Sequence, residues 1–439
     1  MQRRGFVAAT TAAVAASARS ASAATDGKPA LLGGEPVRTA AWPGWPVFDA
    51  TEETGLTAVL KSGKWNRGPG QVVGRFEAAY AKAMGAKGCL ATANGTAALL
   101  ATLNAMNIGP GDEVIVPPYT FVATINVILQ QYALPVFVDS DPATFQIDAS
   151  KIESALTPQT ALIMPVHLGG NVADMDAILA LAGRRNIPVL EDACQSHLAE
   201  WKGRKAGTLG KAGCFSFQAS KNLNSGEGGA ILSNDTQLLD ACYAFHNNSR
   251  RRNTAGYDFS YVNRGLNLRL TEFQGSLLLS QMKRLEAQAA QRDKNADYLT
   301  SLLNEIPGIA PAKKYPGCTR NAYHLYMFRY DAREFAGLPR DRFLKAMEAE
   351  GIPVSGGYSP LNKEPFLTNT LQSKGYRRIY GDQVLKAWAE RNHCPANDRL
   401  CNQAVWLYQG MLLGPRSDMD DVAAAVRKIR RQASLLVKA

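Results

Sequence analysis

The sequence predicts an α/β protein in which a large domain with a mainly parallel sheet, flanked by helices, precedes a smaller C-terminal α+β domain. Short apolar runs alternate with helical segments from about residue 87 to residue 191, which is typical of a parallel sheet covered on both faces. This alternation stops after a long helix. A chain of 439 residues that is 46% hydrophobic and 20% charged is also long and apolar enough for two domains.

Glycine and proline in the first part of the chain favour an extended arm over 24–49. Beyond it, short continuous apolar runs predict strands, and the longer segments between them predict helices. In chain order we expect a helix at Thr51–Ser62, a strand at Lys87–Thr92, a helix at Ala97–Met106, a strand at Glu113–Val116, a helix at Phe121–Gln130, strands at Val136–Asp139 and Ala161–Val166, a helix at Ala173–Arg184, a strand at Pro188–Glu191 and a long helix at Gln274–Gln291.

Mixed elements follow Asp293, which is why we expect a separate second domain there. They include a strand at Tyr323–Tyr330, a helix at Arg340–Glu350 and a final helix at Ser417–Arg431. The chain is thereby divided into a leader at 1–23, the arm at 24–49, the large domain at 50–292 and the small domain at 293–439.

The leader has the pattern of a targeting segment. Arg3 and Arg4 precede a weakly apolar, uncharged run that ends in the A-x-A site Ala21-Ser22-Ala23. This pattern resembles a twin-arginine signal, which exports folded proteins, and predicts an exported or periplasmic protein. The alternative is an alanine-rich leader without export function and a cytoplasmic protein. No later stretch is apolar for long enough to predict a membrane span.

The net charge of +11 does not by itself predict a nucleic-acid partner, because no reading motif accompanies it. A basic cluster at 427–431 is expected on the solvated face of the last helix. The seven cysteines are odd in number and widely spaced without C-x-x-C, which argues against both a disulfide framework and a metal site. A pairing of Cys394 with Cys401 stays open.

The most informative segment is 214–229, where a short apolar and aromatic run leads to Lys221. Small and polar residues surround this lysine, and the glycine-rich run 226–229 follows it. A lysine near an apolar wall loses its proton more readily, and a neutral amine is a nucleophile for carbonyls. The alternative is a surface lysine in a hairpin turn, and only the motifs upstream decide against it.

Those motifs lie at predicted strand ends, where open α/β sheets bind ligands. Asn94-Gly95-Thr96 opens a helix with free amides and a hydroxyl that suit a phosphate, although the same residues fit an ordinary helix cap. Phe121 offers an aromatic face or a core side chain. Asp192 offers a carboxylate that either pairs with a cation or caps a helix. Phosphate cradle, aromatic plate, acid and amine are together what pyridoxal phosphate requires.

The chain resembles the DegT/StrS family of fold-type I aminotransferases, which aminate keto-sugars and keto-cyclitols. The resemblance runs from about residue 31 to the C-terminus. It is carried, in order, by the motifs at 94–99, 111–114, 118–124, 165–168 and 191–193, by the lysine segment, and by Gly265–Glu272.

The resemblance implies a role for each matching residue. Lys221 would form the Schiff base with pyridoxal phosphate and shuttle the proton. Asp192 would pair with the ring nitrogen, Gln195 would lie near the ring hydroxyl, and Phe121 would stack on the ring. The remaining implied contacts are Gly95, Thr96 and Ser216 to the phosphate, Asn267 or Arg269 to the phosphate from the partner subunit of a homodimer, and His324 and Tyr358 to the substrate. Ordinary packing is the alternative for His324 and Tyr358.

Two features refine the expected chemistry. Some relatives carry histidine in place of Lys221 and dehydrate their substrate, so lysine favours amino transfer. Gly169 stands where many members carry tyrosine, which implies a missing substrate or stacking contact. The arm at 32–46 and the segment 357–361 resemble the branch that acts on scyllo-inosose and amino-hydroxybenzoate precursors.

We therefore expect a pyridoxal-phosphate-dependent transfer from L-glutamine or L-glutamate to a keto-sugar or keto-cyclitol. An exported binding or sensor protein that holds the cofactor without catalysis is the alternative, and an intact Lys221 and Asp192 argue against it. A dinucleotide-dependent dehydrogenase is disfavoured because no G-x-G-x-x-G follows an early strand.

Overall fold

The computed structural model describes residues 27–252 and 260–438. The predicted leader at 1–23 lies outside the described residues. Within the described part, the helices lack the combination of length and apolar character that crossing a membrane requires.

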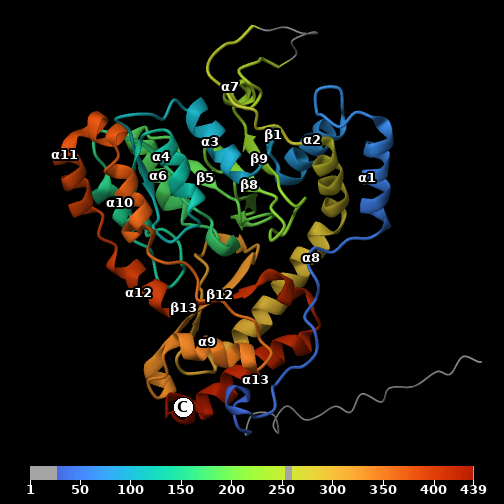
Figure 1. The fold of residues 1–439 in the computed structure, drawn as a ribbon, viewed down its shortest axis with the longest axis vertical. Helices are drawn as coiled ribbons and strands as arrows, with labels where there is room; N and C mark the ends of the chain where they lie inside the picture. The colour runs from blue at the N-terminus through green and yellow to red at the C-terminus, as the bar shows by residue number, and fades with distance from the viewer. Residues whose placement is uncertain (1–26, 253–259, 439) are drawn as a thin grey trace, which may run out of the picture.

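A sheet of mainly parallel strands forms the core of the large domain, as the sequence predicts (Figure 1). Its strands are β1 (Gly88–Thr92), β2 (Glu113–Val116), β3 (Leu134–Phe137), β4 (Thr160–Ile163), β5 (Leu190–Asp192), β8 (Ala212–Ser216) and β9 (Gly229–Ser233). They form the orders β1-β9-β8-β5 and β3-β2-β4, which parallel bridges such as Val166 to Asp192 join side by side. In these two sets of strands, β9 runs antiparallel to both of its neighbours, β1 and β8, and all the other paired strands are parallel.

Helices cover both faces of this sheet because successive strand residues point to opposite sides. In β2, Val114 packs with the helices of one face and Ile115 with those of the other. The first face carries α3 (Gly95–Ala105), α4 (Ala123–Gln130) and α7 (Thr236–His246), and the second carries α2 (Val72–Met84), α6 (Met175–Arg185) and the first part of α8 (Glu272–Asn304). The remaining short elements of this domain are α1 (Ala50–Ser62), α5 (Ile152–Ala155), β6 (Glu200–Trp201) and β7 (Arg204–Lys205), the last two sharing a small sheet with β11 (Cys318–Arg320).

The helix α8 connects the two domains as one continuous rod in Figure 1. The sequence prediction that it ends at Gln291 is wrong, because neither glycine nor proline occurs between Gln291 and Asn304 and its last turns bury Leu299 and Leu303 in the second core. The expected boundary at residue 292 therefore lies inside a helix.

The small domain is an antiparallel sheet with helices packed on it. Its strands follow the order β10-β12-β13. The elements are β10 (Ile309–Pro311), β12 (Leu325–Tyr330), β13 (Ala404–Tyr408), α9 (Arg340–Ala349), α13 (Arg416–Arg431) and α14 (Ala433–Lys438).

Three helices between β12 and β13 pack on the large domain instead. They are α10 (Pro365–Leu371), α11 (Lys374–Arg391) and α12 (Pro395–Gln403), and α10 and α11 lie beside α4 and α6 in Figure 1. The Trp388 indole N–H donates to the Pro135 carbonyl at 2.7 Å, and the Tyr376 hydroxyl donates to the Ala133 carbonyl at 2.9 Å. The edge at β3 is thereby covered by residues far along the chain.

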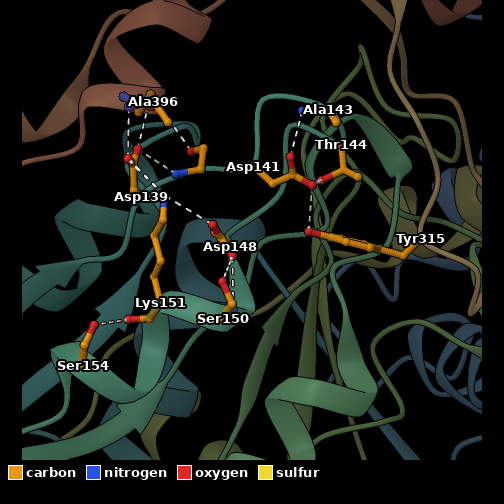
Figure 2. A network of polar contacts seen from close by, with 12 residues as sticks. Asp139, Asp141, Ala143, Thr144, Asp148, Ser150, Lys151, Ser154, Tyr315 and Ala396 are labelled. Atoms are coloured by element: carbon orange, nitrogen blue, oxygen red, sulfur yellow. Dashed lines mark hydrogen bonds and ion pairs between the residues drawn. The ribbon is translucent and has the colours of Figure 1, made fainter.

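Figure 2 shows the polar network that joins the end of β3 to this C-terminal segment. The Asp139 carboxylate accepts the first-turn amides of α12, from Ala396 at 3.0 Å and Asn397 at 2.8 Å, and pairs with Lys151 at 3.4 Å. The Tyr315 hydroxyl donates to the neighbouring Asp141 at 3.0 Å. An aspartate at a helix N-terminus satisfies amides that have no partner within the helix.

The N-terminal arm packs along the small domain. Arg38 pairs with Asp418 and with Asp421, each at 2.8 Å. Lys428 is buried and pairs with the buried Glu350 at 2.9 Å, so the expectation of a wholly solvated basic cluster is wrong for this residue. The arm explains the difference, because its backbone covers this face of α13 and the Glu35 carbonyl accepts from Lys428.

Candidate active site

A cavity of about 610 Å³ lies where the carboxyl end of the sheet meets the small domain. Its lining includes every predicted cofactor and substrate residue except Asn267 and Arg269. The large domain supplies Gly95, Thr96, Phe121, Asp192, Gln195, Ser216 and Lys221, and the second domain supplies His324, Leu325, Tyr358 and Trp406.

Lys221 lies in the loop between β8 and β9, with its amine in this cavity. Burial of the amine lowers the pKa of Lys221 below its usual 10.5, although the nearby Cys194 and Asp192 act in the opposite direction. The backbone before it is held from two sides: the Trp45 indole of the arm donates to the Ala219 carbonyl at 2.9 Å, and the Tyr408 hydroxyl donates to the Ser220 carbonyl at 3.0 Å. The lysine is therefore both fixed in place and easier to deprotonate.

Asp192 ends β5 and presents a buried carboxylate to the same cavity. Its Oδ2 accepts from the Thr124 hydroxyl at 2.7 Å, and its Oδ1 accepts from the Cys194 amide at 3.2 Å. Thr120 lies one turn earlier and hydrogen bonds with Thr124 at 2.8 Å. Donors on two sides orient the carboxylate and leave it able to hold a cationic group.

The part of the cavity wall formed by the start of α3 and by Ser216 has the features of an anion site. The Asn94 side chain caps α3 by accepting from the Ala97 amide at 2.8 Å, so the first-turn amides of Gly95 and Thr96 have no partner within the helix. A Cβ on Gly95 would lie 2.8 Å from the Ser216 Cβ and 2.9 Å from the Cys194 Sγ. Only glycine lets the helix start approach Ser216 this closely.

A buried histidine, His197, contacts the backbone of Ser216. His197 Nε2 lies 2.9 Å from the Ser216 carbonyl oxygen, and its Nδ1 lies 2.9 Å from the Tyr80 hydroxyl. Since a carbonyl only accepts, Nε2 carries the proton and Nδ1 accepts from tyrosine. Burial lowers the pKa of His197 to about 3, so the ring is neutral at physiological pH.

Phe121 and Gln195 also line the cavity. Phe121 is 55% exposed although it is aromatic, which fits a side chain that covers a ligand better than one that fills a core. The Gln195 side chain donates to the Tyr358 hydroxyl at 3.2 Å and accepts from the Gly169 amide at 2.7 Å. Gly169 has φ 67°, and a Cβ there would lie 2.6 Å from the Met327 Cε, so the Met327 side chain leaves little room for a larger residue at this position.

Asn267 and Arg269 lie outside the cavity of their own chain. Arg269 is bridged to Thr92 at the end of β1 and donates to the Asn247 side chain at 3.0 Å. Asn267 is exposed. In the described chain these two residues therefore do not line the cavity.

Sequence reasoning missed four residues that shape the site. Thr124 orients Asp192 and belongs to the motif at 118–124, but from the sequence it was expected only as part of a helix. Asn222 follows the lysine directly. His197 and Trp406 had no signal, because a buried histidine and a strand tryptophan look like ordinary core in one dimension.

The fold matches that of fold-type I aminotransferases, a class of enzymes that depend on pyridoxal phosphate. The chain belongs to the DegT/DnrJ/EryC1/StrS aminotransferase family, which residues 46–427 match. It is thus an enzyme of an aminotransferase family, as its sequence predicts.

Relatives and solved structures agree with this assignment. An L-glutamine:2-deoxy-scyllo-inosose aminotransferase of Streptoalloteichus tenebrarius is 37% identical over 92% of this chain and 97% of its own. The 3-amino-5-hydroxybenzoate synthase of Amycolatopsis mediterranei is 34% identical over 88% and 96%. The crystal structure of a 3-amino-5-hydroxybenzoic acid synthase superposes with a TM-score of 0.80 at 33% identity, covering 90% of this chain and 99% of that one.

Proposed function

We propose that the protein moves an amino group from L-glutamine or L-glutamate to a keto-sugar or keto-cyclitol, with pyridoxal phosphate attached to Lys221. The observation that carries this proposal is the meeting of an amine of lowered pKa and an oriented carboxylate in one cavity. A protein that only bound the cofactor would need neither group so arranged.

The residues present fit pyridoxal phosphate. The free amides of Gly95 and Thr96 with the Ser216 hydroxyl suit a phosphate, and the glycine leaves the space that a Cβ would fill. Asp192 suits a protonated ring nitrogen, and Phe121 suits a ring face. Pyridoxal phosphate, when bound, supplies an aldehyde carbon and an electron-accepting ring.

Each of the residues in the cavity has a separate role in the proposed reaction. Lys221 Nζ, as a neutral amine, would hold the cofactor through its aldehyde group and, once freed by the amino donor, would take the proton from the donor's α carbon. Asp192 keeps the proton on the ring nitrogen, which its negative charge favours. Amide donors at the start of α3 hold the phosphate, so the reacting atoms stay within reach of Lys221.

Two considerations support an uncharged cyclic ketone as the acceptor. Among the described residues that line the cavity, the charged side chains are Lys221, Asp192 and Glu227, and none of them is an arginine that could clamp a diphosphate. Relatives at 37% and 36% identity are named as aminotransferases of 2-deoxy-scyllo-inosose. A polyol ring can hydrogen bond with Gln195, Tyr358 and Glu227 instead of needing a cation.

We also propose a homodimer in which Asn267 or Arg269 reaches the phosphate end of the partner's cavity. Asn267 is exposed beside large exposed apolar residues, Tyr261, Val262 and Leu266, which favour burial against a second chain. Export through the twin-arginine-like leader remains our proposal from sequence. Sequencing the N-terminus of the mature protein tests it, with a new terminus after Ala23 expected and an intact Met1 against it.

The experiment for the function follows the two halves of the reaction. Protein loaded with pyridoxal phosphate is mixed with L-glutamine, L-glutamate or D-alanine while the visible absorbance is recorded, and 2-deoxy-scyllo-inosose is then added. An L-donor should bleach the absorbance, and the ketone should restore it with formation of an amine detected by mass spectrometry. Lys221→Ala is the control without turnover. Absorbance that no donor changes would support the non-catalytic alternative.

A further inference from the structure

The contacts of Asn222 determine which ring nitrogen of His324 carries the proton. The Asn222 Nδ2 lies 2.7 Å from the Ala322 carbonyl oxygen. A carbonyl oxygen accepts only, so the atom at this distance must be the amide nitrogen, and a flipped amide would place two acceptors against each other. The Asn222 Oδ1 therefore faces the His324 Nδ1, at 3.3 Å.

The direction of the next hydrogen bond follows. Since Oδ1 accepts only, His324 Nδ1 carries the proton, and in a neutral ring Nε2 is then a bare acceptor. This bare nitrogen lies 3.4 Å from the Lys221 Nζ. A relay thus runs from the Ala322 carbonyl through Asn222 and His324 to the amine.

We propose that Asn222 is a positioning residue that holds His324 as the Nδ1–H tautomer, so that His324 Nε2 accepts a hydrogen bond from the Lys221 amine and leaves the lone pair of Nζ free to attack a carbonyl carbon. The opposite tautomer would donate to that lone pair and occupy it. The proposal rests on the proposed function of Lys221 and assigns to Asn222 and His324 a role in preparing its nucleophile.

Burial keeps the relay in its neutral form. His324 and Asn222 are both buried, at 5% and 3% exposure. Burial lowers the pKa of His324 well below its usual 6.5, and the positive charge of Arg292 acts in the same direction. A ring that stays neutral keeps one protonated and one bare nitrogen, which is the condition for the relay to have a direction.

The chain offers a matched control within the same loop. Asn224 is buried like Asn222, and its side chain donates to the Lys221 carbonyl at 3.4 Å. No hydrogen bond links it to His324 among the described residues. Asn224→Ala therefore removes a loop asparagine without touching the relay.

The test is the ¹⁵N spectrum of histidine-labelled protein without cofactor, in which protonated and bare ring nitrogens are distinguished directly. The chain has 5 histidines, and a His324→Gln variant assigns the signal. We expect His324 to be protonated at Nδ1 in the unaltered protein and in Asn224→Ala, and to lose this preference in Asn222→Ala. Protonation at Nε2 in the unaltered protein, or an Asn222→Ala spectrum like that of Asn224→Ala, overturns the proposal.

A second readout separates this proposal from the proposed function. When pyridoxal phosphate is added to cofactor-free protein, attachment to Lys221 should be slowed in Asn222→Ala by about tenfold, the size of the loss when the outer hydrogen-bond partner of a metal-binding histidine is removed, and should be unchanged in Asn224→Ala. If no variant, nor the unaltered protein, attaches the cofactor, the proposed function fails while the tautomer remains measurable. If attachment is equally fast in all, the positioning role is refuted and the proposed function stands.

Discussion

The close approach of Gly95 to Ser216 gives the sharpest prediction about cofactor binding. In Gly95→Ala, the new Cβ would lie 2.8 Å from the Ser216 Cβ and 2.9 Å from the Cys194 Sγ, so the start of α3 and the end of β8 must separate. In the protein without cofactor they are free to do so. A bound phosphate has to bring the Gly95 amide and the Ser216 hydroxyl back together, and the strain then opposes binding.

The magnitude follows from the overlap. Inserting a methyl group into a packed site costs about 1–3 kcal/mol. If most of this strain appears on binding, the dissociation constant for pyridoxal phosphate should rise by about 5- to 150-fold, at about 1.4 kcal/mol per factor of ten.

A titration of cofactor-free protein with pyridoxal phosphate, followed by visible absorbance, measures this constant. Gly183→Ala is the matched control, because this glycine lies in α6 with no atom within 4 Å of its added Cβ. It should leave the dissociation constant unchanged and raise the thermal midpoint slightly, since alanine is the better helix former. A Gly95→Ala protein that binds within twofold of the unaltered protein would refute the assignment of this end to the phosphate.

Two further predictions concern stability. The pKa of His197 is lowered to about 3 in the folded protein from 6.5, so between these values the unfolded chain binds one proton more than the folded chain, and acidification from pH 6.5 towards pH 3 should lower the free energy of unfolding by about 1.4 kcal/mol per pH unit through this group. Urea unfolding at pH 7 and pH 5 should therefore show a smaller loss in His197→Gln than in the unaltered protein, and equal losses would contradict the burial argument. Removing the carboxylate in Asp139→Ala leaves the amides of Ala396 and Asn397 without their acceptor and should destabilise the protein by about 2 kcal/mol. Asp382 is the control, because its carboxylate pairs with Arg377 on the exposed surface. Asp382→Ala should leave the urea midpoint of unfolding unchanged.

Much of the large domain was predictable because its strands are short apolar runs with clear ends. The strand at Glu113–Val116 was predicted with the bounds that the structure has, and Asp192 and Lys221 were expected in one site because carboxyl ends of parallel strands share an edge. For these residues the local sequence pattern agrees with the topology of the sheet, so the sequence alone was sufficient to predict them.

The parts of the fold that could not be predicted from the sequence depend on contacts between segments that are distant along the chain. The burial of Lys428 follows from the arm crossing α13, and the course of α8 past Gln291 follows from packing in the second core. Trp388 covers the β3 edge although it lies 253 residues beyond its acceptor Pro135. The hydrophobic periodicity of one segment does not reveal which distant segment packs against it.

Reductive trapping tests the central claim most directly. Protein incubated with pyridoxal phosphate is treated with borohydride, digested and mapped by mass spectrometry. We predict that the cofactor's mass is found on the peptide that carries Lys221, and that Lys221→Ala shows no trapped cofactor. Cofactor trapped on another lysine, or none trapped on the unaltered protein at saturating pyridoxal phosphate, would contradict the assignment of Lys221 as the amine of this site.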